Sequence, residues 1–286
     1  MLAIILAFVS AAFLGTALVL TQFGLRYVAP LPGAAISIPS FTLAFLLLSP
    51  LLLRNQTIIW SAVPIFAAVG VVFPSVLTLL TFEGNRLLGP VITGALGNLS
   101  PLFAVTLAVI LLGEPLRPLQ VVGLLVIVTG VLIITVRRPQ DVANWRSWWL
   151  LLPLGAAALR GLIQPVIKIG LEIWPSPIAA GLTGYIVSAL VVLISARIRT
   201  GRFVTKAPFA GRLWFVAVGF SNGIGVLLMY AALGNGRVSL VAPLVATYPL
   251  MTVGLGTLVL GRADGAARLA GGTALTVAGV VLLLVG

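Results

Sequence analysis

Residues 100–134 read SPLFAVTLAVILLGEPLRPLQVVGLLVIVTGVLII, and this stretch contains two apolar runs separated by the turn Gly113-Glu114-Pro115. The runs belong to predicted helices over residues 88–112 and 118–136, and a helix needs roughly 20 apolar residues to cross a bilayer. A helix that is apolar on every side is either buried in a large core or surrounded by lipid. The stretch therefore predicts two membrane-spanning helices joined by a tight turn.

The composition extends this interpretation to the whole chain of 286 residues. Hydrophobic residues make up 60% of the sequence and charged residues 8%, whereas an ordinary soluble domain has roughly 25% charged residues. A soluble fold needs polar side chains for its outer layer, and only lipid removes that need. We therefore predict an all-α integral membrane protein, surrounded by membrane lipid.

Charges, prolines and glycine clusters divide the chain into about ten transmembrane helices. The apolar N-terminal run has no basic leading region, so we interpret it as the first span and not as a signal peptide. We expect one membrane domain whose first half is residues 1–140 and whose second half is residues 141–286. The predicted spans cover residues 1–20, 34–53, 58–80, 88–112, 118–136, 148–170, 178–196, 213–233, 238–260 and 267–285.

The opening stretch has a second copy about 150 residues later in the chain. Ser100-Pro101-Leu102 corresponds to Tyr248-Pro249-Leu250, and Leu112-Gly113 corresponds to Leu260-Gly261. Each half has an odd number of spans, so the second copy enters the membrane in the opposite orientation. We expect two inverted five-helix repeats around a central cavity.

The net charge of +12 is distributed between the apolar runs. Lys and Arg do not form the aromatic-interleaved clusters that are typical of nucleic-acid binding, so no nucleic-acid partner is expected. Most of them fall in connections on one side of the predicted topology. The positive-inside rule therefore favours a multi-pass protein of the inner (plasma) membrane with both termini outside.

Enzymatic chemistry has little support in this sequence. The chain has no Cys and no His, which excludes thiolate nucleophiles and the commonest general base and metal ligand. We predict that the protein is not an enzyme and holds no metal or cofactor; an intramembrane enzyme and a channel are the alternatives from other classes. The acidic residues lie at span ends or in connectors, and they are Glu83, Glu114, Asp141, Glu172 and Asp264.

Ionisable residues deep in a bilayer are costly and are therefore candidates for function. Arg160 lies near the middle of the span over residues 148–170, and Gln164 and Lys168 follow on the same helical face at steps of four. We expect this face to bind a carboxylate-bearing substrate. The alternative is that Arg160 pairs with Glu83 or with backbone carbonyls, while Lys168 extends to the membrane interface.

Further polar residues occur at comparable positions in the two halves. Proline within a span interrupts the hydrogen-bond ladder and permits a kink where helices line a cavity. Small and hydroxyl residues also serve helix packing, which is the alternative role for this set. Glu114 is expected to be structural and to cap the helix that follows its turn. The remaining candidates for substrate binding are Asn98, Ser100, Tyr248, Asn222, Ser75 and Thr78.

The first half resembles the EamA-type signature of the drug/metabolite transporter superfamily. Most of the signature then recurs in the second half, with Arg262 in place of Glu114. The resemblance rests on Ser100-Pro101-Leu102-Phe103, Leu112-Gly113-Glu114-Pro115-Leu116, Gln120, Gly123 and Gly130-Val131.

This resemblance implies a ten-helix exporter that works by alternating access. It implies export of aromatic or neutral amino acids and related small metabolites, with drugs, purines or other metabolites moved by proton coupling as the alternative. A chain with both halves needs no second copy, so a functional monomer is expected. Because the acids lie outside the span interiors and His is absent, we expect facilitated diffusion without obligatory proton exchange.

Overall fold

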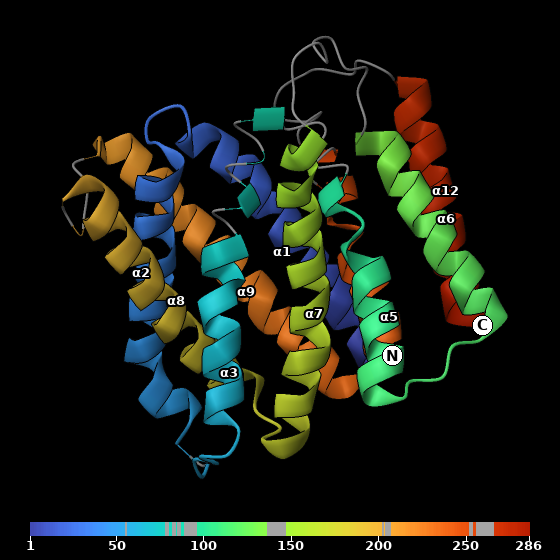
Figure 1. Cartoon of the computed structure of the whole chain (residues 1–286), viewed down its shortest axis with the longest axis horizontal. Coiled ribbons are helices and arrows are strands. Elements are labelled where there is room, and N and C mark those ends of the chain that lie inside the picture. The colour runs from blue at the N-terminus through green and yellow to red at the C-terminus, as the bar shows by residue number, and fades with distance from the viewer. Residues whose placement is uncertain are drawn as a thin grey trace.

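The computed structural model shows a helical bundle (Figure 1). Within its described part the chain forms helices and turns and contains no strand. Five helices there are long and apolar enough to span a bilayer, and five shorter apolar helical stretches accompany them, which gives ten in total. The prediction of an all-α membrane protein with about ten transmembrane helices is confirmed. The described residues are 1–54, 56–77, 80–81, 84, 87–88, 96–135, 147–201, 203, 207–251, 254–255 and 266–286.

The helices follow the predicted spans closely in both halves. Those of the first half are α1 (Leu2–Gly24), α2 (Pro30–Leu52), α3 (Val63–Gly70) with its continuation η1 (Val71–Val76), α5 (Ser100–Leu112) and α6 (Pro118–Thr135). Those of the second half are η2 (Ser147–Leu150), α7 (Leu151–Ile173), α8 (Pro177–Thr200), α9 (Phe209–Asn235), α10 (Val238–Val245) and α12 (Ala266–Val285).

Two predicted spans are interrupted helices in the structure. A turn at Asn98–Leu99 precedes α5, and a turn at Ala246–Thr247 follows α10 before the chain becomes helical again at Tyr248. Pro101 and Pro249 lie just after these turns. Proline fits the first turn of a helix but cannot donate a hydrogen bond to the preceding turn, so each proline begins a new helical segment. The two interruptions occupy equivalent positions in the repeats.

The helix pairs are related by exchange of the two halves. α1 packs against α9 and α7 against α3, while α7 packs against α5 and α1 against α10. By their order in each half, α1, α3 and α5 correspond to α7, α9 and α10. Exchanging each helix for its counterpart therefore converts the α1–α9 pair into α7–α3, and the α7–α5 pair into α1–α10. α2 with α8, and α6 with α12, are pairs of counterparts, and α6 and α12 lie side by side at the edge of the bundle (Figure 1). This pattern is the one expected of two inverted repeats.

Small residues allow these helices to approach closely. The Ser10 hydroxyl on α1 donates to the Gly225 carbonyl on α9 at 2.7 Å. Between α6 and α12, a Cβ atom added at Gly123 would lie 2.6 Å from the backbone nitrogen of Leu283. Close packing of this kind supplies the association energy that the hydrophobic effect supplies in water.

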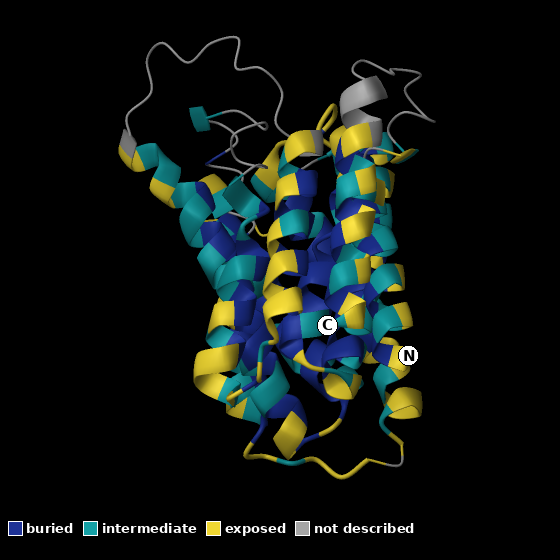
Figure 2. Cartoon of the chain, turned by 90° about the vertical axis from the view of Figure 1, so that its right-hand side faces the viewer, coloured by how far each residue is buried: buried dark blue, intermediate teal, exposed yellow. Residues whose placement is uncertain are grey.

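One end of the bundle is tightly packed. Phe66, Ile167, Leu233, Val238 and Val241 are all fully buried, at 0% exposure. They come from α3, α7, α9 and α10, near the helix ends on the side where the two chain termini lie, and buried residues fill the interior of the bundle (Figure 2). We call this side the sealed end.

Glu114 joins the two halves at the sealed end. Gly113 ends α5 in the left-handed conformation, with φ 63° and ψ 25°, which glycine adopts without steric cost. The following Glu114 carboxylate accepts hydrogen bonds from the backbone N–H groups of Val238 at 2.7 Å and Ser239 at 2.8 Å. These groups open α10 and have no partner within their own helix.

The expectation that Glu114 caps the helix after its own turn is therefore wrong in the choice of helix. α6 begins at Pro118, which has no N–H group to donate. α10 offers two adjacent free N–H groups and the positive end of its dipole, which attracts a carboxylate. The carboxylate is buried, with Glu114 8% exposed.

Replacing Glu114 with Ala should destabilise the protein strongly. The change leaves two buried N–H groups unpaired, and hydrogen bonds to a charged group are worth about 1.5–3 kcal/mol each, so we expect a loss of about 3 kcal/mol in the free energy of unfolding. Thermal unfolding of the purified chain in detergent measures this loss. Glu172→Ala is the matched control because Glu172 is exposed; equal stability of the two variants would contradict the assignment.

Candidate substrate-binding site

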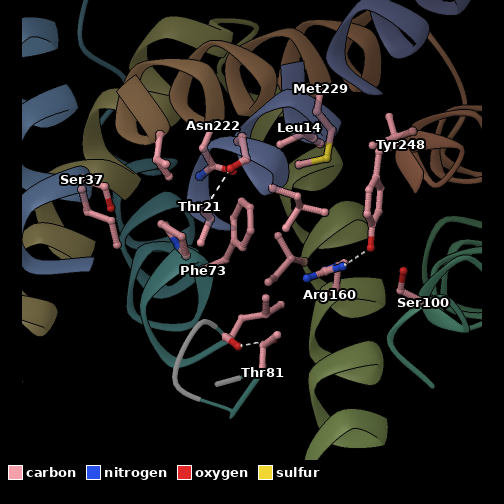
Figure 3. A pocket seen from close by; sticks show the side chains of 18 of the residues that line it. Leu14, Thr21, Ser37, Phe73, Thr81, Ser100, Arg160, Asn222, Met229 and Tyr248 are labelled. Atoms are coloured by element: carbon pink, nitrogen blue, oxygen red, sulfur yellow. Dashed lines mark hydrogen bonds between the residues drawn. The ribbon is translucent and has the colours of Figure 1, made fainter. Parts of the chain in front are cut away.

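A cavity of about 210 Å³ lies at the centre of the bundle, lined by both halves (Figure 3). It extends from the interrupted helices to Thr21, near the end of α1, and to Ala34, near the start of α2. It therefore reaches toward the side opposite the sealed end. The polar residues that line it are Thr21, Ser37, Thr81, Ser100, Arg160, Gln164, Asn222 and Tyr248.

Arg160 projects from α7 toward Tyr248 (Figure 3). Its Nη1 donates a hydrogen bond to the Tyr248 hydroxyl at 3.0 Å, and its guanidinium carbon lies 6.0 Å from the centre of the Tyr248 ring. Arg160 is the one charged residue among the described residues that line the cavity. The site therefore has a cation near the middle of α7.

Neither of the two acidic residues in the described part of the chain neutralises this cation. Glu114 is bound to the start of α10, and Glu172 lies twelve residues further along α7, about 18 Å at the rise of an α-helix. Glu83, the pairing partner considered from the sequence, lies outside the described residues, as do the other two acids. The proposed pair with Glu83 stays a prediction.

A chain of hydrogen bonds connects α7 to both interrupted helices. The Tyr248 hydroxyl donates to Asn98 Oδ1 at 3.3 Å and accepts from Arg160. Asn98 belongs to the turn before α5, and Tyr248 follows the turn after α10. Interrupted helices of this kind carry the substrate sites of many secondary transporters, because the break leaves backbone polar groups beside a cavity. Three predicted site residues are thus brought together.

Gln164 lies one helical turn from Arg160 and lines the same cavity. The residue is 5% exposed, and its Oε1 atom is buried without a hydrogen-bond partner among the described residues. Its position agrees with the expected common face of Arg160 and Gln164. The unpaired oxygen was not foreseeable from the sequence, because pairing depends on neighbouring helices.

The other predicted site residues fall into three groups. Ser100 and Asn222 line the cavity, and the Asn222 amide also donates to the Tyr185 hydroxyl at 3.4 Å. Lys168 and Ser75 do not line it. The Lys168 ammonium donates to the Leu233 carbonyl at 3.0 Å, and the Ser75 hydroxyl to carbonyls of its own helix. Thr78 lies outside the described residues.

The apolar wall of the cavity includes residues that sequence reasoning did not single out. Leu14 and Met229 line the cavity, as does Phe73 (Figure 3). Leucine and methionine are common on every face of a membrane span, so no local signal separates a cavity-lining residue from a lipid-facing one. Only helix packing assigns these two to the wall.

Comparisons with known proteins identify the family. A sequence profile described as the EamA-like transporter family matches residues 1–136 and 147–285. One solved crystal structure is similar with a TM-score of 0.83 and 18% sequence identity, covering 99% of this chain and 96% of the other, which shows a shared fold. A search of curated proteins found no match. The resemblance seen in the signature is confirmed: the chain belongs to the EamA-like transporter family of the drug/metabolite transporter superfamily and is a membrane transporter.

Proposed function

We propose that this transporter exports aromatic or neutral amino acids and related small metabolites by alternating access. The observation that carries the proposal is Arg160, a cation that lines the central cavity without a carboxylate partner among the described residues. A guanidinium binds a carboxylate with two parallel hydrogen bonds, and this interaction is strong where water is excluded. A substrate carboxylate would therefore find a matching cation in the cavity.

The rest of the wall supports a neutral substrate side chain. Phe73, Leu14 and Met229 present apolar surface, and no Asp or Glu is among the described lining residues. A cationic side chain would therefore find no partner there, whereas an apolar or aromatic one would bury its surface favourably. This combination favours aromatic and neutral amino acids over basic ones.

The asymmetry of the cavity supports alternating access. It reaches toward one side, while Phe66, Leu233 and Val238 close the other. We propose that residues 1–140 and 141–286 move against each other to reverse this arrangement, and that one chain suffices.

The basic residues support the direction of export. Arg26, Arg197 and Arg212 lie near helix ends on the side that the cavity reaches. By the positive-inside rule that side faces the cytoplasm, so both termini face outward and the cavity is placed to load a cytoplasmic solute. We propose the inner (plasma) membrane as the location.

Arg160→Ala should abolish saturable amino-acid transport. Removing one partner of a buried charge interaction costs about 2–5 kcal/mol, so we expect kcat/KM to fall at least thirtyfold, while Arg160→Lys keeps the charge and retains part of the rate. Uptake of labelled phenylalanine, tryptophan and threonine into proteoliposomes measures the effect. Arg117→Ala is the control, since Arg117 is exposed and binds the Gly286 carbonyl. Normal transport by folded Arg160→Ala would refute the site.

Transport should not depend on a proton gradient. No Asp, Glu or His is among the described residues that line the cavity, and these are the side chains that usually relay protons within a membrane. We expect equal initial rates of uptake into proteoliposomes under an imposed proton gradient, with and without a protonophore. Saturable counterflow would also separate a carrier from a channel or an enzyme. A rate that collapses with the proton gradient would instead establish coupling.

A further inference from the structure

Gln164 carries an unexplained feature for a residue in the interior of the protein. Its Oε1 atom is buried and lacks a hydrogen-bond partner among the described residues, although the residue lines the central cavity. An unpaired buried acceptor destabilises the folded protein, and native proteins contain few of them. Protein atoms cover this oxygen, so a bound solute with a hydrogen-bond donor would remove this cost after the side-chain amide rotates toward the cavity.

We propose that Gln164 is a specificity-determining residue that accepts a hydrogen bond from the amino group of the substrate. The inference rests on the proposed function and deepens it: the transporter selects α-amino acids over carboxylates of the same shape that lack the amino group. Arg160 binds the substrate carboxylate, and Gln164 accepts a hydrogen bond from the amino group on the adjacent carbon atom.

The spacing of the two residues suits this division of roles. Residues four apart on a helix lie on one face, with Cβ atoms about 5–6 Å apart. Arg160 and Gln164 are four apart on α7, and both line the cavity. The carboxylate and ammonium of an amino acid are attached to one carbon atom, so a single ligand reaches both side chains.

The chemistry of the two side chains is complementary to a zwitterion. A guanidinium has donors and no acceptor, so it binds the carboxylate and not the ammonium. The amide oxygen of Gln164 accepts from an N–H group and repels a carboxylate. Because no described lining residue is acidic, the ammonium meets neutral acceptors, and an amine without a carboxylate gains little by entering.

The preference for amino acids follows because a carboxylate analogue without the amino group leaves the Gln164 oxygen unpaired. 3-Phenylpropanoate matches phenylalanine without the amino group, and 3-hydroxybutanoate matches threonine in the same way. Each analogue satisfies Arg160 but leaves the Gln164 oxygen without a donor. A site with a buried group aimed at a substrate N–H group discriminates strongly against the analogue that lacks it. One lost hydrogen bond corresponds to about a tenfold to hundredfold weaker affinity.

Competition with labelled phenylalanine or threonine uptake in proteoliposomes tests the proposal. The wild-type chain should prefer each amino acid over its analogue at least about tenfold. In Gln164→Met, which keeps the length of the side chain and removes the acceptor, affinity for the amino acid should fall by about this factor while affinity for the analogue stays unchanged.

The controls separate this inference from the proposed function. Gln22→Met changes an exposed glutamine outside the cavity and should behave as wild type. Equal inhibition of the wild-type chain by amino acid and analogue would overturn the inference, whether or not the variants fold. So would an unchanged preference in Gln164→Met. These results leave amino-acid transport standing, whereas failure of the wild-type chain to bind any amino acid overturns the substrate class and this inference together.

Discussion

The structure depends on the need to satisfy every backbone N–H and C=O group without water. In lipid an unsatisfied backbone group costs several kcal/mol, so the spans are helices and irregular backbone is confined to places inside the protein. The turns at Asn98–Leu99 and Ala246–Thr247 obey this constraint, because they lie in the interior near the cavity. The Glu114 carboxylate accepts hydrogen bonds from the first backbone N–H groups of α10, and the Lys168 ammonium donates one to the Leu233 carbonyl, so these backbone groups also have partners.

The same constraint bears on the polar groups beside the two interrupted helices. Two interrupted helices beside each other provide polar neighbours for a partly buried guanidinium within the membrane. Arg160, Tyr248 and Asn98 meet there and connect α7 to both halves. Arg160 and Tyr248 belong to the second half and Asn98 to the first, so the hydrogen bond between Tyr248 and Asn98 is a contact between the repeats.

The two ends of the cavity differ in chemistry as well as in packing. At the sealed end, the Glu114 carboxylate of the first half holds the first N–H groups of α10 in the second half. Arg262 occupies the equivalent position of the second repeat in the sequence and lies outside the described residues. A guanidinium cannot accept a hydrogen bond from a backbone N–H group. The inverted repeats therefore share a fold without sharing this interaction.

Local features of the sequence were sufficient to predict the spans, the repeats and the common face of Arg160 and Gln164. Apolar length, proline position and helical periodicity are properties of neighbouring residues, and the bilayer makes them decisive. Tertiary structure alone decided that Tyr248 and Asn98 meet Arg160, that Lys168 turns to the Leu233 carbonyl, and that the Gln164 oxygen stays unpaired. Each of these depends on how helices from distant parts of the chain pack, and lipid-facing and cavity-facing side chains look alike until that packing is known.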